Sequence, residues 1–192
     1  MFAEHQPIIA ADACASPEGL ARAAVFVLGT IRQPFARACP RIVQLGTRAS
    51  MLSAVRERAR LFVRDAPKHY ARLERCRTPT AALEYLAGNV PGLGLPKAGF
   101  LVQLLRGDVG CLDTVNIALY SVNAEAFSRY KQRSAHGRAR ALLAYVKLCD
   151  KLGGAERLWD VWCAHVGARD TWKGAEHVSL AHVTTIRKAG LQ

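Results

Sequence analysis

Apolar residues recur at helical spacing along most of this chain, and caps, prolines and glycines separate the segments that carry them. Ser16 and Pro17 form a start signal for a helix that runs to about Gly29. No alternating pattern of useful length occurs, so no strand is expected. Further helices are predicted at about 34–45, 80–88, 95–105, 139–152, 155–166 and 180–188.

A proline and a capping residue define helix starts in two other segments. Apolar positions at helical spacing predict a helix around 55–62, and Pro67 is expected to restart the chain into a short new helix. Asp113 is a natural N-cap for a helix that runs through Tyr120. The pattern predicts an all-α fold of nine or ten helices, arranged as one compact, two-lobed domain over 1–192.

Composition narrows the class of protein. With 192 residues, 51% of them hydrophobic, the chain can bury one sizeable core, and its net charge of +12 favours an acidic polymer such as nucleic acid. None of the six cysteines forms a C-x-x-C pair, which favours free thiols over disulfides or a zinc site. The longest apolar stretch, near 21–31, is too short to span a bilayer, and Glu4 and Asp12 argue against a signal peptide. We expect a soluble, cytoplasmic monomer.

The most informative motif is a turn between two helical patterns, Val90-Pro91-Gly92-Leu93-Gly94. A hydrophobic-Pro-Gly-hydrophobic-Gly turn predicts a helix-hairpin-helix, in which glycines permit a tight turn and free N–H groups can hold a phosphate. Asp113 follows Gly94 by 19 residues and opens another helix. A phosphate-holding turn and a carboxylate at this spacing suggest chemistry on a nucleotide.

These motifs, within about 83–120, resemble the core of the helix-hairpin-helix DNA glycosylase superfamily. The turn and Ala98 match that family's Pro-Gly-hydrophobic-Gly-x-x-x-Ala pattern, and Leu112-Asp113-Thr114 is similar to the segment that carries the family's catalytic aspartate. The stretch from Gly110 to Asn116 also resembles small phage-encoded relatives. The resemblance implies that Pro91, Gly92, Leu93 and Gly94 contact DNA and that Asp113 is catalytic.

The chain departs from that family in two respects. It lacks the C-terminal four-cysteine cluster, which several branches also lack, and it differs at one position of the hairpin helix. Bifunctional members carry a lysine two residues after the second hairpin glycine, where this chain has Pro96, and Lys97 comes one residue later. One residue turns a side chain by roughly 100° around a helix, so Lys97 is expected to neutralise phosphate rather than to form a Schiff base. The chain therefore resembles the monofunctional branches, which use aspartate and water, and no metal or organic cofactor is implied.

Asp113 has a chemical role and a structural alternative. Cleavage of an N-glycosidic bond places positive charge on the sugar, and a fixed carboxylate stabilises that charge and orients water. The alternative is a plain helix cap. Thr114 and Asn116 flank the aspartate; Asn116 could hydrogen-bond Asp113 or a nucleotide, or make a local helix contact.

Two groups of cations and several aromatic residues complete the set of candidates. Either cationic group could follow a DNA backbone or form a solvated helix face. The first group is Arg48, Arg56, Arg58, Arg60, Arg64, Lys68, Arg72, Arg75 and Arg77, and the second is Arg129, Lys131, Arg133, Arg138 and Arg140. The aromatic candidates for a flipped base are Phe35, Tyr70, Tyr120, Tyr130 and Trp172, whereas Trp159 and Trp162 are expected in the core.

Taken together, the sequence predicts a double-stranded DNA-binding protein that excises a damaged or modified base, with Asp113 as the essential carboxylate. Two alternatives stay open. One is a non-enzymatic hairpin protein that binds DNA, and the other is a phage enzyme that modifies a flipped base on the same scaffold.

Overall fold

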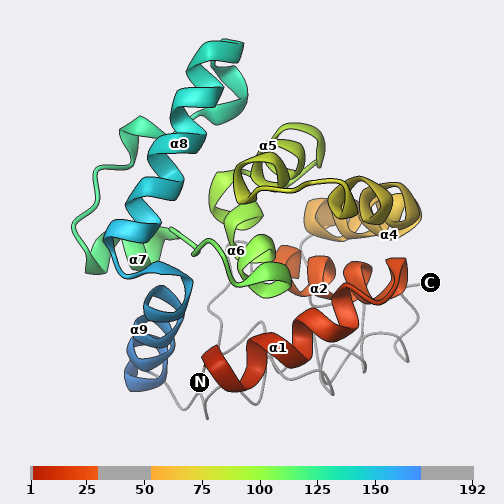
Figure 1. Cartoon of the computed structure of the whole chain (residues 1–192), viewed down its shortest axis with the longest axis horizontal. Helices are drawn as coiled ribbons and strands as arrows, with labels where there is room; N and C mark the ends of the chain where they lie inside the picture. Colours follow the sequence, from red (N-terminus) through yellow and green to blue (C-terminus); the bar gives the residue numbers. More distant parts are fainter. Residues whose placement is uncertain (1, 30–52, 170–192) are drawn as a thin grey trace.

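The computed structural model describes residues 2–29 and 53–169, and in those two ranges the chain folds into α-helices and short 3₁₀ helices without a strand, which confirms the all-α prediction (Figure 1). The α-helices are α1 (Phe2–Ala13), α2 (Pro17–Gly29), α4 (Ser53–Glu74), α5 (Pro79–Asn89), α6 (Leu95–Arg106), α7 (Thr114–Leu119), α8 (Ala135–Lys151) and α9 (Gly154–Arg169). The 3₁₀ helices are η1 (Ala124–Ala126) and η2 (Tyr130–Gln132).

Helix α6 lies at the centre of these helices, in contact with α1, α2 and α5 (Figure 1). Leu95 and every residue from Ala98 to Leu105 are buried, as expected for a helix that is apolar around its whole circumference. Gln103 is the polar member of this run, and its side-chain amide donates to the Ala155 carbonyl at 2.8 Å. The central helix is thereby joined to the start of α9.

Several helix boundaries follow local capping chemistry. The Thr78 hydroxyl accepts a hydrogen bond from the Ala81 amide at 3.1 Å, and Asp113 and Ser134 cap α7 and α8 in the same way. Helix α6 ends at Gly107, whose φ of +70° places it in the left-handed region. The cap at Asp113 confirms the helix start predicted there.

The pattern predicts no helix before Ser16, but α1 forms there with Pro7 inside it, because Ile9 and Ala13 are buried in the core. One predicted boundary is wrong. Helix α4 runs through Pro67 without restarting. The proline is exposed, while Ala66 beside it and His69 beyond it are buried, so the packed face continues past it.

Other predictions fall partly beyond the described ranges. The predicted helices at 34–45 and 180–188, and with them Phe35, Cys39 and Trp172, lie outside the described residues.

Cys14, Cys76, Cys111 and Cys149 are free thiols, and the last three are buried. No helix in the described ranges combines the length and the apolar character needed to cross a membrane.

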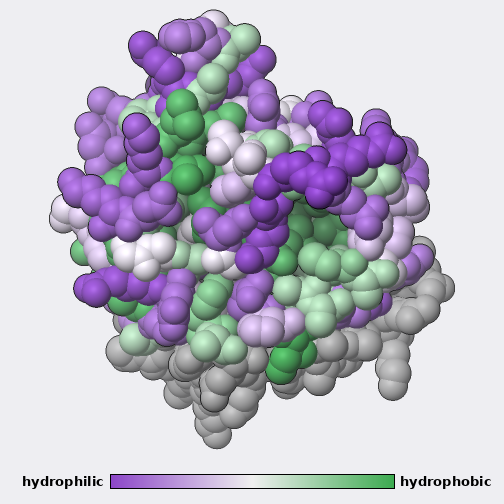
Figure 2. Space-filling model, in the orientation of Figure 1, coloured by the Kyte–Doolittle hydropathy of each residue, from purple (hydrophilic) through white to green (hydrophobic). Residues whose placement is uncertain are grey.

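The visible surface is strongly hydrophilic over much of α8 and around α4, and hydrophobic side chains show between α8 and α5 (Figure 2). Leu143 on α8 is an exposed hydrophobic residue, at 53% exposure. The division into two lobes stays a prediction.

Candidate functional site

The turn between α5 and α6 has the tight geometry that its glycines predict. Gly92 adopts a φ of +87°, a value that L-residues with side chains rarely tolerate. The Leu93 amide closes the turn on the Val90 carbonyl at 3.3 Å, and the Leu93 side chain is fully buried. Gly94 then caps α6 with an extended backbone and no side-chain hydrogen bond.

The turn also leaves donors available. Among the described residues, the amides of Gly92, Gly94 and Leu95 donate to no backbone or side-chain acceptor. Gly94 is exposed, and α6 is long enough to carry a full positive dipole end at this terminus. Free amides at a helix N-terminus suit an anion such as a phosphate oxygen.

Asp113 lies at the start of α7 as the cap that the sequence predicts. Its Oδ1 accepts hydrogen bonds from the amides of Val115 and Asn116, each at 3.0 Å. Its Oδ2 accepts from the indole Nε1 of Trp162 on α9 at 3.2 Å. Because a carboxylate has about four acceptor positions, one remains for water or a ligand.

Trp162 combines two roles, of which the sequence indicated one. It is buried, at 9% exposure, as expected of a core residue, and it also holds the carboxylate of Asp113. Its ring lies in an aromatic cluster with Trp159 and Phe100, at centroid distances of 6.5 and 6.3 Å. No local pattern links a tryptophan to an aspartate 49 residues earlier, so this contact was missed.

The loop that precedes Asp113 is held by a buried tyrosine. The Tyr145 hydroxyl accepts from the Leu112 amide at 2.9 Å and donates to the Gly110 carbonyl at 3.1 Å. Burial raises the pKa of Tyr145 well above its ordinary value, so the hydroxyl keeps its proton and can act as this donor. A Cβ on Gly99 would lie 2.2 Å from the Tyr145 oxygen, so glycine is required there for the tyrosine to fit.

Asn116 holds the same loop from its other side. Its side-chain amide donates to the Cys111 carbonyl at 2.8 Å, and its 1% exposure removes it from any surface where a nucleotide could bind. The same amide also lies 3.4 Å from the Leu158 carbonyl on α9, so the side chain holds the loop and α9 instead of making a contact within α7. Thr114 is exposed as the first residue of α7.

The hairpin and the aspartate loop are neighbours in space. The Cys111 thiol donates to the Pro96 carbonyl at 3.3 Å, which joins the first turn of α6 to the residue two before Asp113. Lys97 places its ammonium 5.6 Å from the centroid of the Phe100 ring. Burial raises the pKa of Cys111 well above its usual range, and the nearby positive charge of Lys97 opposes that shift.

Most of the second cationic group binds backbone carbonyls. Lys131 donates to Val90, Arg133 to Ser128 and Glu125, and Arg138 to Arg133. These contacts tie the segment that contains η1 and η2 to itself and to the hairpin. Arg140 is exposed on α8. Arg138 therefore has a structural contact besides any role on DNA, whereas Arg140 retains its role as a candidate DNA contact.

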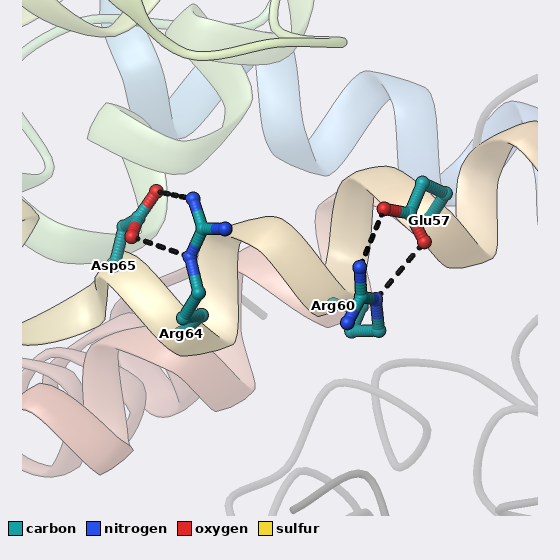
Figure 3. A network of polar contacts seen from close by, with 4 residues as sticks. All are labelled: Glu57, Arg60, Arg64 and Asp65. Carbon is teal, nitrogen blue, oxygen red and sulfur yellow. Dashed lines mark hydrogen bonds and ion pairs between the residues drawn. The ribbon is translucent and has the colours of Figure 1, made fainter.

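Part of the first cationic group is neutralised on α4. Arg60 pairs with Glu57 at 2.9 Å, and Arg64 pairs with Asp65 at 2.8 Å (Figure 3). Both pairs are exposed, and each raises the pKa of its arginine and lowers that of its acid. These two arginines fit the solvated-face alternative better than a DNA contact.

The aromatic candidates separate by their contacts. The Tyr70 hydroxyl donates to the Cys14 carbonyl at 2.6 Å and is a structural link between α4 and the end of α1. Tyr130 is buried at 4% exposure, and its hydroxyl has no hydrogen-bond partner in the described part of the chain. Tyr120 likewise has a buried hydroxyl without a partner there.

The described residues contain no group of three or more His, Cys, Asp or Glu side chains arranged to hold a metal ion. Comparison with known proteins finds no matching family model, no similar curated protein and no similar solved structure.

Proposed function

We propose that this chain binds double-stranded DNA through the hairpin turn and excises a base with Asp113 as the essential carboxylate. The observation that carries the proposal is the contact between two motifs. A turn with free amides lies next to a loop that presents a carboxylate, and the Cys111–Pro96 hydrogen bond joins them. A phosphate held at the turn brings its own strand to the aspartate.

Fixed geometry supports a role for Asp113 in the reaction. Three N–H donors hold its carboxylate, one of them from Trp162 on α9, and the buried Tyr145 on α8 restrains the preceding loop. A negative charge that does not reorganise is what an oxocarbenium-like sugar requires for stabilisation. Lys97 approaches the same region as a cation that favours phosphate.

A second candidate function is DNA binding without chemistry. The observation in its favour is that both oxygens of Asp113 already have structural partners, as a helix cap and as an acceptor for Trp162. This protein would hold DNA at the hairpin and release it unchanged.

The test is a panel of duplexes that carry different damaged or modified bases, heated in alkali to reveal abasic sites. On the active duplex, Asp113→Asn is expected to slow single-turnover excision by about a hundredfold or more. The variant also places an amide donor against the Trp162 indole, so we expect a stability loss of about 1–2 kcal/mol.

Trp162→Phe is the control, because it removes the same hydrogen bond and keeps the carboxylate. It should slow excision much less than Asp113→Asn does, because the amides of Val115 and Asn116 still orient the carboxylate. Excision at the wild-type rate by Asp113→Asn would reduce Asp113 to a cap. Binding by the wild type without excision on any duplex would favour the second candidate.

A further inference from the structure

A pocket of about 510 Å³ opens directly beside the hairpin turn. Residues 92–96 form one side of it, the segment at 127–132 forms the other, and Ile117 on α7 contributes from between them. Neither Asp113 nor Lys97 is among the lining residues. The pocket is thus a neighbour of the excision site and separate from it.

Apolar groups dominate the pocket wall. Leu93, Leu95 and Phe127 are buried, and Pro96 is half-buried. The Phe127 ring is held edge-on by the buried Tyr145, at a centroid distance of 5.3 Å. A rigid wall of this kind suits the flat face of a base or a sugar.

Two cations from distant parts of the chain meet at the rim. Lys131 lines the pocket and donates one of its three N–H groups to the Val90 carbonyl at 3.1 Å. Arg58 on α4 lies against Gly92, since a Cβ there would come within 2.6 Å of the Arg58 Cδ. Burial lowers the pKa of Lys131, and the positive charge of Arg58 lowers it further.

These cations lack the acidic partners that others on α4 have. Arg58 makes no hydrogen bond or ion pair with a described residue, in contrast to Arg60 and Arg64 on the same helix (Figure 3). Two neighbouring positive charges repel one another, and a bound anion relieves that repulsion. The free amides of Gly92 and Gly94 point to the same kind of ligand.

We propose that this pocket binds one unstacked nucleotide of the DNA, with its phosphate at Arg58, Lys131 and the turn amides and its base against the apolar wall. The inference rests on the proposed DNA binding. The cavity has the size of a small-molecule site, so it admits one nucleotide and excludes a duplex. DNA that already contains an unpaired nucleotide should bind more tightly, because a paired one must first be unstacked.

The test compares two labelled duplexes by fluorescence anisotropy: one fully paired and one with a single bulged nucleotide. The wild type should bind the bulged duplex about tenfold more tightly. Ser128→Trp fills the pocket from an exposed position, and it should abolish that preference while paired-duplex binding stays. Ala126→Trp is the matched control, because Ala126 is exposed in the same segment and does not line the pocket.

A second pair of variants tests the cations beside the pocket. Arg58→Gln should weaken binding of both duplexes by about fivefold or more, whereas Arg60→Gln, whose arginine already pairs with Glu57, should leave binding unchanged. Thermal unfolding confirms that each variant folds. Equal binding of the two duplexes by the wild type, or a retained preference in folded Ser128→Trp, would overturn the pocket and leave DNA binding intact. Binding to neither duplex would overturn the proposed function itself.

Discussion

At the scale of single residues, the aspartate loop depends on close fit around Tyr145. The tyrosine hydroxyl occupies the space that a side chain on Gly99 would need, and it exchanges hydrogen bonds with both sides of the loop. A glycine on the central helix thus determines whether a residue on α8 can hold the backbone next to Asp113. Helix propensity alone would favour alanine at that position.

Gly99→Ala should therefore destabilise the fold by about 2–3 kcal/mol, because its Cβ would collide with the Tyr145 hydroxyl and the Gly110 carbonyl. Chemical denaturation measures this loss. Tyr145→Phe removes the colliding oxygen, so the double variant should lose less stability than the sum of the two single variants. Strict additivity would show that the two residues do not compete for this space.

A second residue-scale prediction concerns pH. Burial lowers the pKa of His69 on α4, although nearby Asp65 opposes the shift. The ring packs on Phe62 at a centroid distance of 4.6 Å, and its Nδ1 lies 2.7 Å from the Tyr85 hydroxyl. The unfolded chain, with a histidine pKa of about 6.5, therefore binds a proton more readily than the folded chain does.

It follows that the stability contributed by neutral His69 is present above pH of about 6.5 and is lost as the pH falls through the lower folded pKa. Urea unfolding at neutral pH and at mildly acidic pH should show a larger loss for the wild type than for His69→Gln, which cannot titrate. Equal losses in the two proteins would assign the acid sensitivity to other groups.

At the scale of elements, the hairpin consists of α5, a turn and α6. Gly94, at the cap position of α6, has no side chain that could accept a hydrogen bond from the helix. Gly94 has an ordinary φ of −83°, and a Cβ there would meet nothing closer than the Pro96 Cδ at 3.9 Å. Gly92, in contrast, has a positive φ and Arg58 against it. Gly94 is therefore the position at which charge can be changed without strain.

Gly94→Asp and Gly94→Asn should each leave stability unchanged or raise it by a few tenths of a kcal/mol, because both side chains cap helices. Their effects on duplex binding should differ. The aspartate places a negative charge where a phosphate is expected and should weaken binding about tenfold or more, while asparagine stays near the wild-type affinity. Gel-shift titration distinguishes them, and equal affinities would remove the turn from the DNA contact surface.

Elements with local causes could be predicted from the sequence, and those with distant causes could not. Thr78 and Asp113 indicate helix starts, because their side chains accept hydrogen bonds from backbone amides two or three residues later. Helix α1 and the passage of α4 through Pro67 depend on burial against other helices. The same division applies to the site: the turn and the cap were predictable, whereas Trp162 and Tyr145 act from 49 and 33 residues away.

At the scale of the whole molecule, the cations behind the net charge of +12 differ in whether they already have partners. Arg60 and Arg64 are neutralised in place, Arg133 and Arg138 bind backbone, and Arg58 and Lys131 meet at the hairpin. Net charge alone therefore overstates the number of cations available to DNA. What the sequence could not show is that members of both cationic groups converge on one turn.

Duplex binding should fall steeply with salt, because each neutralised phosphate releases condensed counterions. Between about 50 and 200 mM salt, a loss of about a hundredfold or more is expected if several of these cations contact phosphate. Anisotropy titrations at several salt concentrations give the slope. An affinity that does not change with salt would mean that the hairpin and its cations do not face the DNA backbone.

The restraints on the loop at 110–113 also determine which parts of this site would keep their geometry in another protein scaffold. The hairpin turn is closed by its own backbone hydrogen bond and by the burial of Leu93, so the geometry proposed to bind phosphate depends mainly on α5 and α6. The carboxylate does not, since its position depends on partners from α8 and α9. If the proposed function is right, transplanting the segment at 83–120 into another scaffold would transfer the proposed DNA binding without the proposed excision, and changes in α8 or α9 would reduce excision before they reduced binding.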